Sequence, residues 1–317
     1  MQAAIRTHDL TKDYQVGFWR PRPYRALDGL SIAVAPGDVF GFLGPNGAGK
    51  TTTLKLLMQL VFPTSGTAEI LGRPVGDVAV RRRIGYLPEN PYFYDHLTAE
   101  ELLHYYARLF RMGAADRARR VPAILDRLGV GAERRMQLRK FSKGMLQRVG
   151  VAQALINEPD LVIFDEPMSG LDPLGRREVR ALILRLRDRG CTVFFSSHVL
   201  SDAEALCSRV AILARGRLVA SGHLSDMTAF ENRGWELVVT NLPESVVARL
   251  AGRVTRTTQL GAGRYTLELP LDPPPERLLA ELTALGAHPV SLNPIRDTLE
   301  DVFVQKVAAP PAAEVRS

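Results

Sequence analysis

The sequence is poor in features that define several common classes of protein. It has only two cysteines in 317 residues, too few for a disulfide framework or a cysteine-based metal cluster. It contains no apolar run near the roughly 18 residues that are needed to cross a bilayer. Its first ten residues lack the apolar core of a secretory signal. We therefore expect a chain that resides in the reducing cytosol and has no membrane-spanning segment.

Charged residues of both signs are present and mostly dispersed. The formal net charge is +7, from 41 basic and 34 acidic residues. Only residues 111–143 depart from this mixture, with ten basic residues against three acidic ones. Such an excess can face nucleic acid or an anionic membrane surface, although a solvated helical face is the commoner reason for it. With 46% hydrophobic residues, the chain can build a full core and a second domain.

The strongest pattern lies in residues 39–57, where an apolar run is followed by a glycine-rich turn and then by a helical pattern. The turn matches G-x-x-x-x-G-K-T in the strand, loop and helix context that a phosphate-binding loop requires. Glycine lets the backbone wrap a phosphate, and successive N–H groups with the helix dipole form an anion site. The residues expected to bind the nucleotide are Gly44, Pro45, Asn46, Gly47, Ala48, Gly49, Lys50, Thr51 and Thr52. Lys50 would reach the β- and γ-phosphates, and the Thr51 hydroxyl would bind Mg²⁺.

Two other apolar segments end in polar residues that suit phosphate chemistry. Residues 161–164 predict a buried parallel strand, and Asp165 and Glu166 follow at its carboxyl end, where α/β folds bind ligands. Asp165 suits the Mg²⁺ shell, and Glu166 suits the orientation or deprotonation of an attacking water. Residues 191–197 predict another buried strand, which delivers His198 to the same edge of the sheet. We expect His198 to contact a γ-phosphate.

The N-terminal region is less regular. Residues 3–10 predict a first strand that ends in a turn at Lys12–Asp13. The segment after Tyr14 interleaves aromatic residues with arginines, and its prolines exclude a regular helix. One of its aromatic side chains could stack on an adenine ring, or the segment could be a loop whose tip contacts a membrane surface.

Residues 97–156 predict an inserted helical subdomain. Thr98 and Glu101 have the spacing of a capping box. Another helix begins after Ser142 and Gly144, where unpaired N–H groups and the helix dipole favour an anion.

The order of these motifs resembles that of the ATP-binding subunit of ABC transporters. The matching segments are GPNGAGKTT (44–52, Walker A), FSKGM-LQR (141–148, the signature), LVIFDE (161–166, Walker B with its catalytic glutamate), SGLD (169–172, the D-loop) and His198 (the switch histidine). The resemblance covers residues 3–224. It implies an α/β P-loop NTPase with a RecA-like sheet core, an antiparallel β region and the inserted helical subdomain, within an ATPase domain over residues 1–224.

The resemblance implies further roles for individual residues. Tyr14 would be the aromatic side chain that stacks on adenine. Ser142, Gly144 and Asp172 would lie at the nucleotide, the first two reaching it from the second subunit of a head-to-tail dimer that encloses two ATP molecules. The second subunit could be an identical copy or a paired ATPase. Closing and opening of the dimer would drive a separate multi-span permease, with the chain peripheral on the cytoplasmic face of the cell membrane.

Two motifs depart from the family pattern. Glu89 replaces the Q-loop glutamine, and an ionised carboxylate cannot donate a hydrogen bond, although it can reach Mg²⁺ or its waters. The signature has Lys143 and Met145 in place of Gly and Gln. A variant signature together with a GYLPE stretch resembles the subfamily that pairs with ABC-2-type permeases, so export is the expected direction.

Two other classes of protein use the same loop. A soluble ABC-type ATPase that acts on ribosomes or nucleic acid would use residues 111–143 to contact phosphates. However, the sequence has one cassette, no long heptad coiled coil and no zinc-type Cys/His spacing. A small-molecule P-loop kinase leaves His198 and the signature unexplained. We therefore expect a transporter ATPase that uses ATP and Mg²⁺ and has no nucleic-acid partner.

The remaining residues predict a small α+β accessory domain over 225–307. Its expected strands are 235–242, 263–271 and 288–294, and its expected helices are 244–250 and 275–285. The ending TLEDVFVQKV resembles the tail of ABC-2-type ATPase subunits, and residues 308–317 predict a disordered end.

Overall fold

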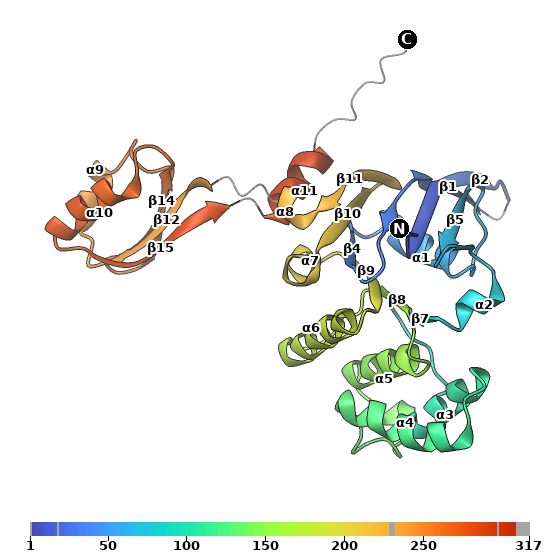
Figure 1. Ribbon diagram of the computed structural model, residues 1–317. Helices are drawn as coiled ribbons and strands as arrows, with labels where there is room; N and C mark the ends of the chain where they lie inside the picture. Colours follow the sequence, from blue (N-terminus) through green and yellow to red (C-terminus); the bar gives the residue numbers. More distant parts are fainter. Residues whose placement is uncertain (1, 18, 228–231, 297, 309–317) are drawn as a thin grey trace, which may run out of the picture. The chain divides into compact units, whose positions relative to one another are not determined.

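The computed structural model describes residues 2–17, 19–227, 232–296 and 298–308. These residues form two compact units, of which the first ends at Leu224 and the second begins at Ser225 (Figure 1). The first unit contains two β-sheets, and the second contains one antiparallel sheet. Of the disordered end expected at 308–317, only Ala308 lies among the described residues, and it ends a helix.

The central sheet of the first unit has the strand order β11-β10-β4-β9-β8-β7 and is parallel except for the β10–β11 hairpin. Strands β4, β8 and β9 are buried along their whole length, as continuous apolar runs predict for parallel strands that are covered on both faces. The bounds are β4 (Val39–Leu43), β7 (Ile84–Leu87), β8 (Leu161–Asp165), β9 (Thr192–Ser197), β10 (Arg209–Ala214) and β11 (Arg217–His223).

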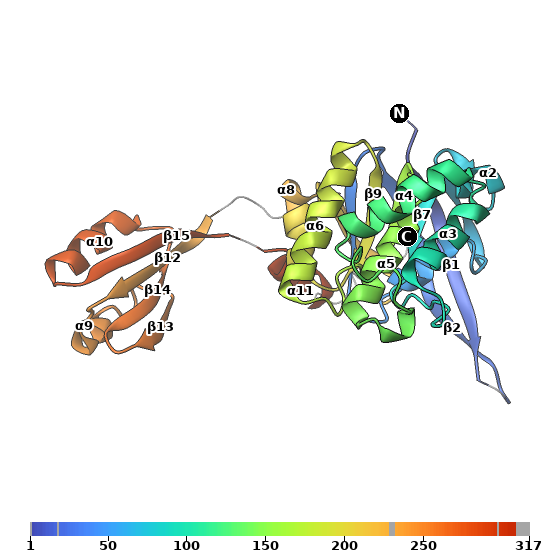
Figure 2. The ribbon, with the colours of Figure 1, turned by 90° about the horizontal axis from the view of Figure 1, so that it is seen from below.

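An antiparallel sheet in the same unit has the order β2-β1-β5-β6, with β3 beside β1. Its strands are β1 (Ile5–Val16), β2 (Arg22–Leu30), β3 (Ala33–Val34), β5 (Ser65–Ile70) and β6 (Arg73–Pro74). The turn predicted at Lys12–Asp13 is wrong, because β1 continues to Val16. Shifts of register on either side of Lys12 bend the strand as a bulge does, and pairing with β2 resumes beyond it. The resulting hairpin extends beyond the rest of the unit (Figure 2).

One buried cluster joins the two sheets around α1 (Lys50–Leu57). It combines Leu54 of α1 with Leu27 of the antiparallel sheet and with Phe40 and Phe194 of the central sheet. The Phe40 and Phe194 rings are stacked, with 5.6 Å between their centroids. This packing holds β4 beside β9, so the loop after β4 lies next to the carboxyl end of β9.

The remaining helices of the first unit include a separate helical group. Helices α3 (Ala99–Leu109), α4 (Ala114–Arg127) and α5 (Lys143–Leu155) gather beyond β7 (Figure 1). The others are α2 (Val78–Arg81), a 3₁₀ turn (Leu138–Lys140), α6 (Pro173–Asp188) and α7 (Leu200–Leu206), and the short α8 (Leu224–Met227) begins at the last residue of this unit. Within the part of the chain that the structure describes, no helix is long and apolar enough to cross a membrane.

Helix α3 begins with the capping box that the sequence predicts. The Thr98 hydroxyl accepts a hydrogen bond from the Glu101 N–H, and the Glu101 carboxylate accepts one from the Thr98 N–H. Thr98→Ala is expected to destabilise the protein by about 1 kcal/mol, the usual cost of losing a cap. Urea unfolding measures this difference, with Ser201→Ala, an exposed hydroxyl on α7, as the control. Equal shifts in the two variants would contradict a capping role for Thr98.

The second unit is a sheet of order β13-β14-β12-β15 with two helices packed on it. Its elements are β12 (Asn232–Thr240), α9 (Glu244–Arg249), β13 (Arg256–Gly261), β14 (Arg264–Pro270), α10 (Pro275–Ala284), β15 (His288–Arg296) and α11 (Leu299–Ala308). Strand β13 was not predicted. All six of its residues are exposed, so its sequence lacks the apolar alternation that marks a strand with one buried face.

Candidate functional site

The glycine-rich loop after β4 is held close to the neighbouring backbone. A Cβ at Gly44 would lie 2.4 Å from the Leu213 carbonyl oxygen, and one at Gly49 would lie 2.6 Å from that of Ala26. Both glycines also have positive φ values, 156° and 105°, which other residues rarely adopt. The loop therefore needs glycine at these positions to turn from β4 into α1, whose N-terminal end is an anion site.

Lys50 is the first residue of α1 and is almost fully buried. Its Nζ donates hydrogen bonds to the carbonyl oxygens of Gly44 at 2.7 Å and Pro45 at 3.3 Å. The same nitrogen lies 3.3 Å from Glu166 Oε1, and the two side chains are only 6% and 8% exposed. The ammonium group thus lies inside the loop, where it can exchange backbone carbonyls for phosphate oxygens.

The carboxyl ends of β8 and β9 bring three polar residues together, because Asp165 and Ser196 are register partners. Ser196 Oγ donates to Asp165 Oδ1 at 2.6 Å and accepts from the Glu166 N–H at 3.0 Å. Burial raises the pKa of Asp165, while the Ser196 and Thr51 hydroxyls act in the opposite direction. Ser196 was not predicted as a site residue, since its role depends on a partner that is distant in sequence.

Glu166 joins Lys50 to His198. Its Oε2 lies 2.8 Å from His198 Nδ1, and the His198 N–H donates to the same oxygen at 3.4 Å. Glu166 has a φ of 50°, a left-handed conformation that is uncommon for a residue with a side chain and is often found at functional sites. The turn after β8 therefore directs this carboxylate toward the loop and the histidine.

A cavity of about 360 Å³ contains most of the predicted nucleotide-binding residues. It is lined by residues 45–52 of the loop and by Tyr14, Tyr24, Ala26, Glu89 and Glu166. The predicted Tyr14 and Glu89 thus lie at the same cavity as Lys50. Tyr24 is an additional lining residue, which the sequence marked only as one aromatic residue of an irregular segment. The pairing of β1 and β2 places it directly opposite Tyr14.

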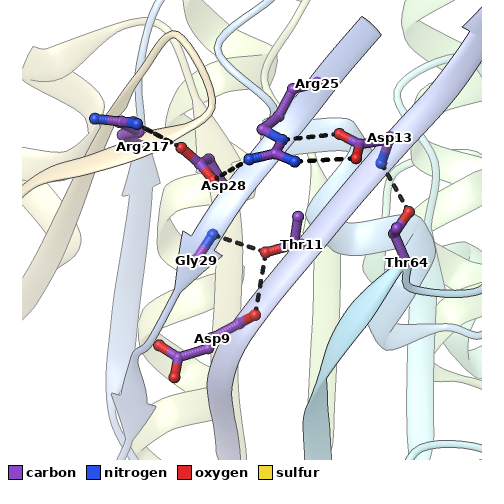
Figure 3. A network of polar contacts seen from close by, with 8 residues as sticks. All are labelled: Asp9, Thr11, Asp13, Arg25, Asp28, Gly29, Thr64 and Arg217. Atoms are coloured by element: carbon purple, nitrogen blue, oxygen red, sulfur yellow. Dashed lines mark hydrogen bonds and ion pairs between the residues drawn. The ribbon is translucent and has the colours of Figure 1, made fainter. Parts of the chain in front are cut away.

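A network of polar contacts fixes the hairpin that carries these two tyrosines (Figure 3). Asp13 and Arg25 are register partners next to Tyr14 and Tyr24, and Arg25 donates to both Asp13 oxygens, at 2.9 and 3.1 Å. These bonds hold the pKa of Asp13 below its ordinary value.

The network continues to other elements of the first unit. Arg25 also donates to Asp28 at 3.0 Å, and Asp28 accepts from Arg217 of β11 at 2.8 Å. The Asp13 N–H donates to Thr64 Oγ1 at 2.9 Å. The hairpin is therefore anchored on two sides.

Tyr24→Ala is expected to weaken ATP binding about five-fold or more, because stacking of a base on an aromatic ring contributes about 1–3 kcal/mol. Tyr14→Ala is expected to weaken it at least as much. Titration with a fluorescent ATP analogue measures both. Tyr92→Ala is the control, since Tyr92 is 94% exposed and does not line the cavity. Wild-type affinity in Tyr24→Ala would exclude a contact with the base.

The predicted site residues that do not line this cavity are Gly44, Asp165, His198, Ser142, Gly144 and Asp172. The last three lie at the starts of helices. Ser142 Oγ accepts from the Met145 N–H at the start of α5, at 3.2 Å, and Asp172 accepts from the Gly175 N–H at the start of α6, at 2.7 Å. Gly144 lies in the first turn of α5. The Ser142 and Asp172 side chains therefore act as helix caps in this chain.

The basic region 111–143 is partly neutralised within the first unit. Arg119 pairs with Asp116 at 2.8 Å. Arg134 and Arg135 lie 3.8 and 3.6 Å from Glu100. These pairs favour a solvated helical surface over a continuous nucleic-acid-binding face.

The residues at the strand ends fit a magnesium ion. Asp165 Oδ2 is buried without a hydrogen-bond partner among the described residues, as expected of a ligand oxygen, and Thr51 lies beside the same carboxylate. Across residues 2–17, 19–227, 232–296 and 298–308, no group of three or more His, Cys, Asp and Glu side chains could hold an ion by itself. Magnesium in ATPases is usually held by one or two protein oxygens together with substrate phosphates and water.

The sheet, loop and strand-end residues define a nucleotide-binding ATPase of the P-loop class. The ABC transporter family model matches residues 27–169. An uncharacterized ABC transporter ATP-binding protein of Synechocystis sp. is 44% identical over 305 residues, which cover 96% of this chain and 84% of the relative. The chain belongs to the ATP-binding subunits of ABC transporters.

Other comparisons agree with this family. The Nod factor export ATP-binding protein I of Paraburkholderia xenovorans is 35% identical over 88% of this chain and 91% of the relative. An ATP-binding subunit of an ABC transporter matches with a TM-score of 0.63 and 33% identity, over 71% of this chain and 91% of that structure. The cassette MJ0796, solved as a dimer bound to ADP and Pi after hydrolysis, matches with a TM-score of 0.64 and 25% identity, over 69% and 98%.

These findings confirm the predicted α/β P-loop fold and the predicted class of enzyme. The chain is an ATP-binding, ATP-hydrolysing subunit, and subunits of this family dimerise and act with a membrane permease. The relative from Paraburkholderia xenovorans is named as an export protein, which favours the transporter over an ATPase that acts on ribosomes or nucleic acid.

Proposed function

We propose that Glu166 is the general base of ATP hydrolysis and that Lys50 and His198 stabilise the γ-phosphate. The observation that carries this proposal is the continuous contact from Lys50 through Glu166 to His198 beside the glycine-rich loop. Lys50 would move from the loop carbonyls to phosphate oxygens. Glu166, released from the ammonium group, would accept a proton from the attacking water. Bound Mg²⁺, held by Thr51 and Asp165 with Glu89 near its waters, would neutralise phosphate charge.

The contact with Glu166 constrains the protonation of His198. An ionised carboxylate only accepts, so Nδ1 carries the proton in this pair. Nε2 is then the ring nitrogen that would meet the γ-phosphate.

We further propose that Ser142, Gly144 and Asp172 act at the nucleotide of a second subunit, in a homodimer or with a paired ATPase. Helix α5 has 13 residues and no acidic residue in its first turn, which leaves its positive N-terminal end open to an anion. Tyr14 and Tyr24 would contact adenine in the first subunit. The γ-phosphate would thus hold the two subunits together, and its release would loosen them.

The permease surface would lie on the helical group and on the segment after Glu89. Three tyrosines there are exposed, Tyr92 by 94%, Tyr94 by 57% and Tyr105 by 45%. Aromatic residues are enriched at protein interfaces. We propose a multi-span permease of the ABC-2 type, acting in export, with the chain on the cytoplasmic face of the membrane. The segment 225–307 would be an accessory domain of this ATPase.

Co-purification of a tagged chain from membranes tests this proposal. A multi-span partner is expected, and its recovery should fall in a triple Tyr92, Tyr94 and Tyr105→Ser variant. A control variant with Phe62→Ser, an exposed aromatic residue elsewhere in the unit, should retain the partner. Recovery of ribosomes or nucleic acid without a membrane protein would contradict the permease assignment and leave the ATPase assignment intact.

A further inference from the structure

A second cavity in the first unit shares no lining residue with the nucleotide cavity. Its volume is about 690 Å³, within the range of small-molecule sites. It lies between α4, the end of α5 and α6. Its apolar lining includes five buried side chains, Ile124, Leu155, Ile156, Leu182 and Cys191.

Four arginines surround this apolar lining, Arg120 and Arg127 from α4 and Arg185 and Arg189 from the end of α6. Only Arg120 has an ion-pair partner among the described residues, Glu158 at 3.0 Å. The other acidic lining residue, Asp160, is paired with Arg83 at 2.5 Å. The four lining arginines therefore outnumber the two lining carboxylates, each of which already has an arginine partner.

Helix ends account for part of this arrangement. Arg127 lies in the last turn of α4 and Arg185 in the last turn of α6, where a cation offsets the negative end of the helix dipole. One cation at the end of each helix is enough for this stabilisation, and a side chain in solvent can provide it. This stabilisation does not explain why arginines from two helices border the same apolar cavity.

We propose that this cavity binds an amphipathic anion, with one carboxylate, phosphate or sulfonate group and a compact apolar body. The planar guanidinium group matches such oxyanions with two parallel hydrogen bonds, and the apolar lining suits the body of the ligand. The ligand contacts α4 of the helical group and α6, which begins after Asp172. It also reaches Cys191, which directly precedes β9, and His198 directly follows that strand. The site therefore connects the helical group with the strand that leads to the histidine.

Fluorescence titration of the full chain with 1-anilinonaphthalene-8-sulfonate tests the proposal. Saturating ADP is present throughout, to occupy the nucleotide site. Saturable binding is expected with a Kd on the order of 10⁻⁵ M, from the usual affinity per atom of ligands of this size. The neutral probe N-phenyl-1-naphthylamine has the same ring system without the sulfonate. It should bind about ten-fold more weakly, because it cannot form charge-assisted hydrogen bonds.

Two variants and one control locate the binding. Arg127→Gln/Arg185→Gln should weaken sulfonate binding about ten-fold and leave the neutral probe unchanged. Ala123→Trp fills the cavity from α4 without changing any charge, and it should weaken both probes. Arg187→Gln is the matched control, since Arg187 lies on α6, pairs with Asp188 and does not line the cavity. Its binding should equal that of the wild type.

Several outcomes would overturn the proposal. Equal affinity for the two probes would show that the arginines do not recognise the anion. Equal losses of sulfonate affinity in Arg187→Gln and in the double variant would show that only the net charge of the protein matters. Unchanged binding in Ala123→Trp, or binding only at millimolar probe, would place the probe elsewhere, even if the double variant fails to fold.

Discussion

Glu166→Gln is expected to lower ATP turnover by about 10²- to 10⁴-fold, the usual contribution of a positioned general base, and to retain ATP binding. The amide keeps the size of the side chain and cannot accept a proton from water at neutral pH. It also removes the negative charge beside Lys50, so the ammonium group becomes more available to phosphate. Turnover of Mg·ATP should therefore fall, while equilibrium binding of labelled ATP should be equal to or tighter than that of the wild type.

Glu69→Gln is the matched control for this substitution. Glu69 is an exposed residue of β5 outside the cavity, and its variant should have wild-type turnover. Wild-type hydrolysis in Glu166→Gln would remove Glu166 as the base. Loss of ATP binding together with turnover would mean that the carboxylate is required to build the site rather than to act in the chemical step.

Lys50→Met is expected to lower turnover by at least about 10²-fold, because a preorganised positive donor to the developing phosphate charge is lost. A second effect concerns stability. Lys50 and Glu166 are 6% and 8% exposed, and removing one member of a buried pair leaves an uncompensated charge. The expected destabilisation is about 3 kcal/mol, since the Glu166 carboxylate keeps only its contact with His198.

A double-mutant cycle separates the destabilisation caused by the unpaired Glu166 carboxylate from the destabilisation caused by lost packing. Lys50→Met/Glu166→Gln should be less destabilised than Lys50→Met alone, because the unpaired carboxylate is gone. Urea unfolding of the variants in the absence of nucleotide measures the difference. Lys55→Met, on the exposed face of the same helix, should unfold like the wild type. A double variant that is as unstable as the sum of both single variants would exclude coupling between Lys50 and Glu166.

Contiguous sequence patterns predicted the elements that carry the chemistry. The loop over 44–52 is one uninterrupted motif, and its geometry follows from glycine conformations and helix polarity alone. Asp165, Glu166 and His198 were placed together because the carboxyl ends of parallel strands meet at one edge of a sheet. The capping box at Thr98 was also predicted from the sequence, because Thr98 and Glu101 lie within one turn of the helix.

Other features required contacts between distant segments. Ser196 connects Asp165 to the Glu166 backbone only because β8 pairs with β9. The turn predicted at Lys12–Asp13 was wrong, since the pairing of β1 with β2 outweighs local preference and continues past the bulge. Strand β13 was not predicted, because an exposed edge strand has no alternation of apolar and polar residues.

The sequence by itself predicted a nucleotide-binding loop, the residues proposed to contact the phosphates, and the family to which the ATPase is related. Each motif behind these predictions is local, since it consists of residues a few positions apart. Only the tertiary structure decided that Tyr24 lies opposite Tyr14, that Glu166 lies between Lys50 and His198, and that arginines from α4 and α6 border one cavity. These arrangements depend on strand register and helix packing between segments that are far apart in the chain, so no local sequence pattern predicts them.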